Sequence, residues 1–141
     1  MAYLTSRPEG IPSSPQKMQR YTWYNMWKTK RWPYNEILPG DLVCWYERSR
    51  DAVVWQTHVV KIERFHYPKK SEAARIIERR FGHHVDRSED YYQTRPARGF
   101  CVAFSVKTGK RLNLRKPRTL KFSRLGWQRV NAEIASKWLR V

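Results

Sequence analysis

The stretch from residue 42 to residue 65 constrains the fold more than any other part of the chain. Residues 42–46 read Leu-Val-Cys-Trp-Tyr and follow a Pro-Gly-Asp turn, a pattern typical of a compact apolar strand. After a charged turn at 47–51, residues 52–65 are expected to pair back on this strand as a hairpin. Val54 and Val60 lie on one face of this second strand, whereas Trp55 and Val59 lie on the other. Apolar side chains on both faces favour a curved, barrel-like sheet.

Other segments add strands and a few helices around this hairpin. Ser71 is expected to cap a helix that ends at about Phe81, with Gly82 as its terminator. Asn131 is expected to cap a short final helix. The alternation of apolar and polar residues predicts further strands at 2–5, 99–106, 112–114 and 127–130, with a turn at 107–110.

The remaining segments are interpreted as loops or stay unassigned. The stretch around 9–20 is rich in Pro, Ser and Gly, and 83–98 is polar and is expected to be a long, mobile loop. The period of residues 20–32 is too irregular to assign. The chain is therefore predicted to be a single α+β domain, residues 1–141, built on a small curved β-barrel of about five or six strands with flanking helices.

The net charge points to an anionic partner. The chain has 29 Lys and Arg against 12 Asp and Glu, a formal charge of +17. Binding to a membrane surface would favour an amphipathic basic helix, but the basic residues here are dispersed through loops and strand ends. Nucleic acid, DNA or RNA, is the expected partner, because a polyanion rewards dispersed cations through counterion release. The alternative is that the charge only keeps the protein soluble.

Neither a membrane location nor a bound cofactor is expected. No apolar run approaches the roughly 20 residues of a membrane-spanning helix, and the first residues lack the pattern of a secretory signal, so we predict a cytoplasmic location. Cys44 and Cys101 lie in apolar strands and are interpreted as small hydrophobic residues. His83 and His84 are adjacent, which does not suit a metal pair on one helix face, and no metal site or cofactor is predicted.

Aromatic and basic residues alternate along the chain in a way that suits nucleic acid. Seven Trp, eight Tyr and five Phe are mixed with Lys and Arg, and stacking on a ring contributes about 1–3 kcal/mol per base. Trp45 and Trp138 are expected to pack in the core, while Trp23 and Trp27 suit either the core or a pocket wall. The expected phosphate-binding residues are Lys28, Lys30, Arg31, Lys110, Arg111, Arg115, Lys116, Arg118, Lys121 and Arg124.

Several short motifs follow one another in an order that matches a known family. Residues 3–9 combine a strand with a Ser-x-Pro turn, and Trp23 precedes the Pro-Gly-Asp-Leu-Val-Cys-Trp-Tyr segment at 39–46. The later motifs are the strand at 53–65 with Tyr67-Pro68 after it, the closing segments 99–106 and 120–127, and the final helix at 131–139. In this order the chain resembles EVE domains, which are members of the PUA-like superfamily.

The resemblance implies a barrel with a pocket that accepts a flipped-out modified base. Relatives in the superfamily, including YTH and SRA domains, insert methylated or otherwise modified bases into such cages. Carried over by position, the residues that would bind the base are Ser6, Trp23, Asn25, Trp27, Tyr46 and Trp127. Stacking would hold the ring, and the short polar side chains would bond its edge. The chain is thus predicted to read a modified base while its basic surface holds the phosphate backbone.

Two other functions stay open. The chain could bind RNA without selectivity through the basic residues from Lys107 to Arg129. It could also be a small hydrolase of modified nucleosides, as are some related ASCH-type barrels that use Lys, Thr and Glu. Thr57, Lys61 and Glu63 would be the matching residues, but no nucleophile with a positioned base is visible, so we predict that the chain is not an enzyme. A nuclease or other effector domain, in trans or in a longer chain, would then act on the bound strand.

Overall fold

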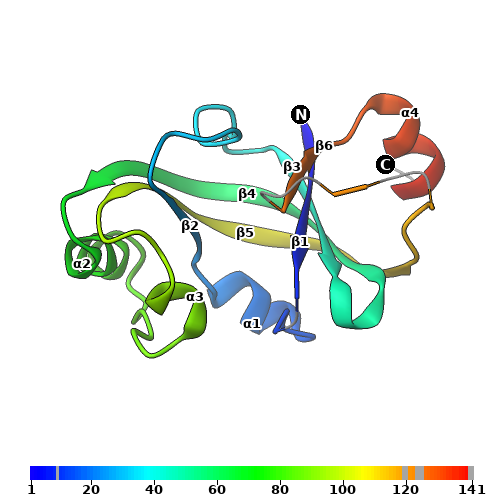
Figure 1. Ribbon diagram of the computed structural model, residues 1–141. Coiled ribbons are helices and arrows are strands. Elements are labelled where there is room, and N and C mark those ends of the chain that lie inside the picture. The colour runs from blue at the N-terminus through cyan, green and yellow to red at the C-terminus, as the bar shows by residue number, and fades with distance from the viewer. Residues whose placement is uncertain (9, 119–120, 123–125, 140–141) are drawn as a thin grey trace.

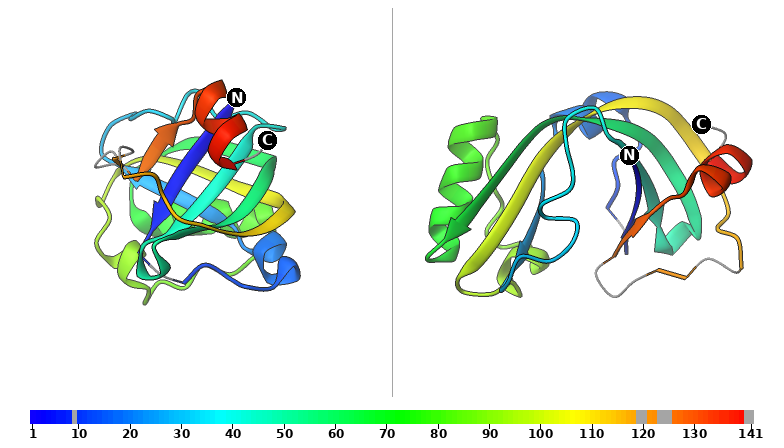
Figure 2. Two further views of the ribbon diagram at one scale, coloured as in Figure 1. Left: turned by 90° about the vertical axis from the view of Figure 1, so that its right-hand side faces the viewer. Right: turned by 90° about the horizontal axis from the view of Figure 1, so that it is seen from above.

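A curled six-stranded sheet forms the body of the protein. The computed structural model describes residues 1–8, 10–118, 121–122 and 126–139. The strands, with the order β2-β5-β4-β3-β1-β6 in the sheet, are β1 (Ala2–Arg7), β2 (Trp23–Trp27), β3 (Leu42–Glu47), β4 (Ala52–Tyr67), β5 (Gly99–Leu114) and β6 (Trp127–Arg129). Figure 1 shows the helices around this sheet, and Figure 2 shows the sheet bent into an open arch. The predicted α+β class and the curved sheet of about six strands are confirmed.

The curl of the sheet comes from the long pairing between β4 and β5. Both strands have 16 residues, and they pair antiparallel from Val53 opposite Leu114 to Tyr67 opposite Gly99. The register shifts at three places along this ladder, and β-bulges of this kind bend a strand and increase its twist. The predicted hairpin of β3 and β4 is confirmed.

The expected turn at 107–110 is wrong, because β5 passes directly through it. Lys107 pairs with His58 and Thr108 pairs with Thr57, so the ladder with β4 continues. A Cβ atom at Gly109 would lie 3.0 Å from the backbone oxygen of Gln56. Glycine is therefore needed here for a close approach of two backbones at a bulge, and it does not mark a chain reversal.

Helix α1 (Pro15–Arg20) lies in the segment 9–20 that the sequence interprets as a loop. The Ser14 hydroxyl accepts a hydrogen bond from the backbone N–H of Lys17 and caps the helix, and Met18 is buried beneath it. A helix of six residues is too short to show a period of 3.6, which explains why the pattern of apolar residues does not reveal it.

The helix predicted before Gly82 is confirmed, with a different start. Helix α2 (Lys70–Phe81) begins after Lys69, and no side chain caps it, so the expected role of Ser71 as the cap is wrong. Gly82 ends the helix with a φ of 74°, a left-handed conformation that glycine adopts at little cost. The buried face of α2 packs with Tyr67 and Cys101 on the outside of the sheet.

Two further helical segments complete the fold. Helix α3 (Asp90–Gln93) lies within 83–98, so this segment is not entirely a loop. The final helix predicted after Asn131 is confirmed as α4 (Ala132–Ile134) with a π-helical continuation at Ala135–Leu139. Among the described residues, no helix combines the length and the apolar character that crossing a membrane requires.

Aromatic side chains fill the interior of the curl. Trp45 has no exposed surface, which confirms its predicted place in the core, and its ring packs on Trp23 with a centroid distance of 4.3 Å. Trp127 on β6 packs edge-on against Phe104 on β5. Trp138 packs on a separate small cluster around Leu4.

Strand β2, in the segment that could not be assigned from its sequence, forms one edge of the sheet. It pairs antiparallel with β5 from Trp23 opposite Phe104 to Trp27 opposite Phe100, and all five of its residues are buried. The other edge is β6, which pairs with β1. The Trp127 Nε1–H donates a hydrogen bond of 3.1 Å to the Asn25 Oδ1 and so joins the two edge strands through their side chains.

Replacement of Gly99 tests how closely β2 packs on the start of β5. In Gly99→Ala the new Cβ would lie 2.1 Å from the carbonyl oxygen of Trp27, a backbone atom that cannot move away cheaply. We expect the free energy of unfolding to fall by about 3 kcal/mol in urea denaturation. Gly82→Ala, which strains only a left-handed helix end, should cost about 1 kcal/mol. Equal losses in the two variants would contradict the close packing.

Candidate functional site

A cavity opens where the two edges of the curled sheet face each other. Its volume is about 590 Å³, which lies within the range usual for ligand sites. The end of β1, the strand β2, the short 3-10 helix Arg48–Arg50 and helix α3 all contribute to its wall. Segments far apart in the chain therefore meet at this site only because the sheet curls.

Asn25 lies at the centre of a hydrogen-bond network in the wall of the cavity. Its Oδ1 accepts from Trp127, and its Nδ2 donates to the Tyr91 hydroxyl at 3.2 Å. The backbone N–H of Met26 also donates to the Tyr91 hydroxyl, at 3.2 Å. These bonds fix the amide from two sides and still leave it one N–H and one lone pair, with which it could bond the edge of a ligand.

The cavity offers aromatic faces beside short polar groups. Trp27, Tyr91 and Phe122 line it together with Ser6 and Asn25. The Ser6 hydroxyl makes no hydrogen bond within the described part of the chain, while the Ser6 backbone N–H donates to the Gly126 carbonyl at 2.7 Å. Flat rings and free hydrogen-bonding groups in one cavity suit a planar heterocycle.

The charges on the cavity wall all have one sign. Arg7, Arg31, Arg48 and Arg95 line it, and no Asp or Glu does so among the residues that the structure describes. The Arg95 guanidinium lies 4.5 Å from the centroid of the Tyr91 ring. Low-dielectric walls that carry one sign of charge focus the electrostatic potential and attract an anion.

The structure brings together three of the residues predicted to bind a base. Ser6, Asn25 and Trp27 line the cavity, and Asn25 links it to Trp127 in the core behind. Trp23 packs between Tyr21 and Trp45 and is 7 % exposed.

Tyr46, which the sequence also places in the base-binding set, lies beside the cavity and not on its wall. Its ring packs on Phe122 at 4.8 Å, and its hydroxyl donates to the Asp51 carboxylate. Burial, with Asp51 as the second cause, raises the pKa of Tyr46 to about 12. The phenol therefore stays protonated at neutral pH and supports Phe122 from behind.

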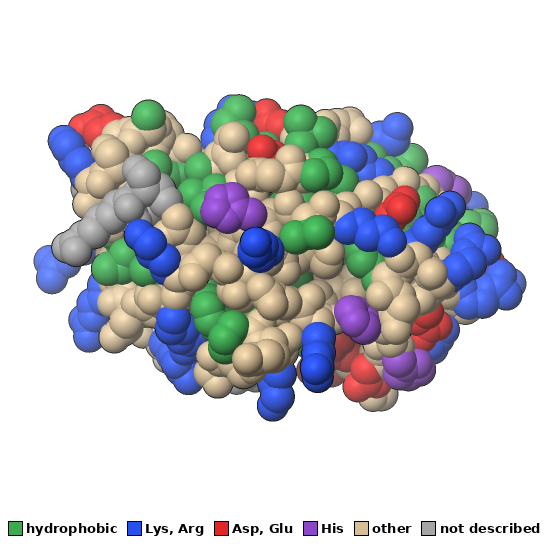
Figure 3. All heavy atoms as spheres, turned by 180° about the vertical axis from the view of Figure 1, so that it is seen from behind, with side chains coloured by type: hydrophobic (Ala, Val, Ile, Leu, Met, Phe, Trp, Pro, Cys, Tyr) green, Lys and Arg blue, Asp and Glu red, His purple; other side chains and the backbone are tan. Residues whose placement is uncertain are grey.

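Of the predicted phosphate-binding residues, Arg31 lines the cavity. Lys28 and Lys30 precede Arg31 in the sequence, and both are exposed. The Lys30 ammonium lies 5.3 Å from the centroid of the Phe100 ring. Six other predicted residues do not line the cavity. They lie in the second half of β5 or in the segment after it: Lys110, Arg111, Arg115, Lys116, Arg118 and Lys121. Arg124 lies outside the described residues. Figure 3 shows Lys and Arg side chains spread over the back of the molecule, which agrees with a dispersed positive surface.

The sequence does not predict seven residues of the cavity wall: Arg7, Pro8, Arg48, Tyr91, Arg95, Phe122 and Gly126. Arg7 is the middle residue of the Ser-x-Pro motif, and this motif is the one signal in the sequence that marks it. Tyr91 and Arg95 come from a polar segment interpreted as a loop, and no local pattern marks them.

The three residues considered for a hydrolase do not form a common site. The Thr57 hydroxyl is buried, where it accepts from the Trp45 Nε1–H at 2.8 Å and donates to the Val43 carbonyl. The Lys61 ammonium instead donates to a backbone carbonyl of α2 and lies 4.9 Å from the Phe81 ring centroid. At the register shift between Val59 and Lys61, Val60 is an extra residue in β4, and it breaks the simple alternation that would align Thr57 with Lys61 and Glu63.

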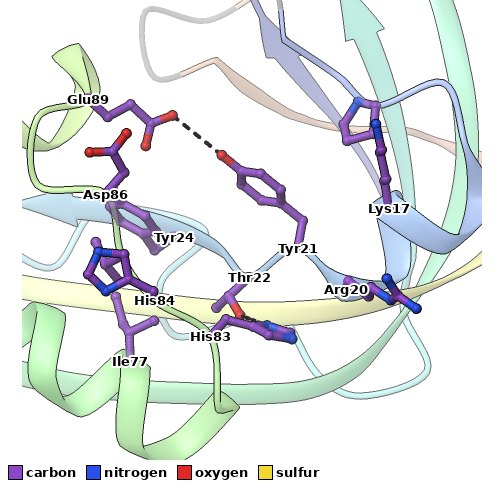
Figure 4. Close-up of a pocket in the computed structure, with 12 residues that line it drawn as sticks. Lys17, Arg20, Tyr21, Thr22, Tyr24, Ile77, His83, His84, Asp86 and Glu89 are labelled. Carbon is purple, nitrogen blue, oxygen red and sulfur yellow. Dashed lines mark hydrogen bonds between the residues drawn. The ribbon is translucent and has the colours of Figure 1, made fainter.

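A second cavity, of about 490 Å³, lies between α1, the start of β2 and the end of α2. Lys17 and Arg20 lie on one side of it and Asp86 and Glu89 on the other, and the Tyr21 hydroxyl donates to Glu89 at 3.4 Å (Figure 4). Carboxylates in this wall repel phosphate groups, so the cavity of mixed charge suits a polyanion less well than the arginine-lined cavity does.

The cysteines contribute no reactive group. Cys44 and Cys101 are both buried and free, and burial raises the pKa of Cys44 to about 12. In the described part of the chain, no three His, Cys, Asp or Glu side chains gather as a metal site would need. The chemistry that the arginine-lined cavity offers is binding through stacking, hydrogen bonds and positive charge.

The curled six-stranded sheet is an arrangement that is also found in solved structures. Two solved mutant structures of the ASCH protein ZmASCH from Zymomonas mobilis have this fold, with TM-scores of 0.65 and 0.59. Each is 12% identical in sequence to the present chain. The matches cover 96% of the present chain and 94% and 92% of the two ZmASCH chains. No family model and no curated protein matches the chain.

The comparison supports the predicted curved α+β fold, which the chain shares with ZmASCH. The structural neighbours are ASCH proteins, so the narrower resemblance to EVE domains stays a prediction. At 12% identity the likeness shows the shared fold alone, and the use of the cavity has to be argued from its own residues.

Removal of the indole N–H of Trp127 tests the bridge between the sheet edges. In Trp127→Phe the buried Asn25 Oδ1 loses its donor, and the smaller ring also leaves a cavity at this 1 % exposed position. A double-mutant cycle with Asn25→Ala isolates the hydrogen bond, and we expect a coupling energy of about 1 kcal/mol in urea denaturation. A coupling energy near zero would contradict the bridge.

Proposed function

We propose that the chain is a nucleic-acid-binding domain that takes one base into the arginine-lined cavity. The observation that carries this proposal is the combination of aromatic faces with four arginines and no carboxylate on the described wall. Stacking on Trp27 and Phe122 would hold the base, and Arg31 and Arg48 would hold the phosphates on either side of it. The formal charge of +17 supplies long-range attraction for the strand.

The finer proposal is that the cavity selects a modified base. A base enters only if its nucleotide leaves the stack, which costs a few kcal/mol that contacts in the cavity must repay. The fixed amide of Asn25 and the Ser6 hydroxyl offer donors and acceptors for the polar edge of the ring. An added methyl group gains roughly 0.8 kcal/mol through burial where the wall fits it.

Salt dependence of binding tests whether the cavity arginines hold phosphates. The logarithm of the binding constant falls linearly with the logarithm of the salt concentration. For a single-stranded oligonucleotide, Arg31→Gln/Arg48→Gln should make this negative slope shallower by about 1.4, or about 0.7 per phosphate contact. The matched control is Arg79→Gln/Arg80→Gln, which removes the same charge from exposed positions on α2 and should change the slope much less.

The same titration distinguishes unselective binding. If the basic residues of β5 hold the oligonucleotide, Lys110→Gln/Arg111→Gln will make the negative slope shallower by a larger amount than Arg31→Gln/Arg48→Gln does. That result would contradict the proposed role of the cavity and support an RNA-binding surface without a base pocket.

Matched oligonucleotides test base selection. One sequence is compared with and without a single methylated cytosine, hydroxymethylated cytosine or methylated adenine, by fluorescence anisotropy. One modification should bind at least about fourfold more tightly, the value of a buried methyl group. Trp27→Ala should abolish this preference, whereas Trp138→Ala, outside the cavity, should keep it. Equal affinity for all four oligonucleotides would rule out the reading of a modified base and leave the coarser function intact.

A further inference from the structure

The guanidinium of Arg7 is the least satisfied charged group in the wall of the cavity. Its Nε and Nη2 atoms are buried and have no hydrogen-bond partner within the described part of the chain. The guanidinium carbon lies 5.5 Å from the ring centroid of Trp23 and 5.7 Å from that of Trp45. Burial lowers the pKa of Arg7, although a guanidinium still carries its charge at neutral pH.

No carboxylate pairs with Arg7 in the structure as described. Glu47, its partner in the β1–β3 ladder, forms an ion pair with Arg50 at 3.0 Å instead. The charge of Glu89 has only a small raising effect on the pKa of Arg7. Glu89 itself lines the cavity of mixed charge beside α1. A cation with two buried and unpaired N–H groups, in a wall that also holds Arg31, Arg48 and Arg95, costs stability unless a ligand supplies the negative charge.

The geometry of the unpaired atoms indicates which kind of group would satisfy them. Nε–H and Nη2–H form one edge of the guanidinium and point in the same direction, so they match two oxygens of a carboxylate or a phosphate. No hydrogen bond holds this edge, so turning it toward the cavity would break none.

We propose that Arg7 binds an oxyanion carried by the ligand inside the cavity, either the phosphate of the bound nucleotide or a carboxylate on its base. This inference rests on the proposed function and sharpens it, since it makes negative charge within the cavity part of recognition. The guanidinium lies to one side of the packed Trp23 and Trp45 rings, within cation–π distance of both.

Small ligands test the oxyanion directly. Calorimetry compares a nucleoside, its 5′-monophosphate, the nucleoside with a carboxylate on its base, and inorganic phosphate. We expect at least one of the two anionic nucleosides to bind tenfold or more tightly than the neutral one, and the preferred one identifies the source of the oxyanion. Equal affinity for the neutral and both anionic nucleosides would overturn the proposal.

Variants of Arg7 separate binding from structure. Arg7→Gln should remove the preference for the anion while the unliganded protein keeps or gains thermal stability, because a buried unpaired charge is lost. Arg7→Lys should keep part of the preference, since it retains the charge without the two-pronged edge. Arg79→Gln, exposed on α2, is the control and should leave the preference unchanged. Full preference in Arg7→Gln, or a loss of preference explained by unfolding in both Arg7 variants, would overturn the proposal.

Failure of this inference is distinguishable from failure of the proposed function. If oligonucleotides bind and Trp27→Ala weakens them, but Arg7→Gln binds every ligand as the parent protein does, only the role of Arg7 is wrong. If phosphate and the monophosphate bind through Arg7 but oligonucleotides do not bind, the role of Arg7 stands and the nucleic-acid function is wrong.

Discussion

The long, bulged ladder between β4 and β5 determines the shape on which everything else depends. Sixteen-residue strands that paired without irregularity would form a broad twisted ribbon, whereas three register shifts bend this pair into an arch. The bend turns β2 toward β6, so that Asn25 and Trp127 come within hydrogen-bonding distance. The cavity is the space left at this near-closure, and its wall is therefore assembled from segments that share no local sequence signal.

The arrangement of charges around the cavity lowers the stability of the fold. Four arginines around one cavity repel one another, and two N–H groups of Arg7 are buried without a partner in the described part of the chain. The aromatic core carries the opposing contribution, because Trp23, Trp45 and Phe104 bury large apolar surfaces directly behind the site. A protein of this kind should be stabilised by its own ligand, since the ligand removes an electrostatic cost that the empty fold bears.

The parts of the fold that the sequence predicts well are those with strong local patterns. The hairpin of β3 and β4, the helix that ends at Gly82 and the buried Trp45 follow from apolar alternation and from glycine at a helix end. Gly109 was misinterpreted because the glycine of a bulge and that of a turn look alike in sequence.

Only part of the cavity wall can be predicted from the sequence, because its residues come from segments far apart in the chain. The motif order pointed to Ser6, Asn25 and Trp27, which do line the cavity. It could not point to Tyr91, whose hydroxyl reaches Asn25 from a four-residue helix 66 positions away. Contacts of this kind depend on the curvature of the sheet, which no local pattern encodes.

The parallel pairing of β1 with β3 gives the cavity a place in the order of assembly. β1 lies inside the sheet, between β3 and β6, so the wall at Ser6 is completed only when the backbone around Gly126 arrives beside it. During synthesis from the ribosome, most of the arch can form while the ligand site is still incomplete. A nascent chain that stalls before residue 126 therefore carries the basic surface while the wall of the cavity is still incomplete.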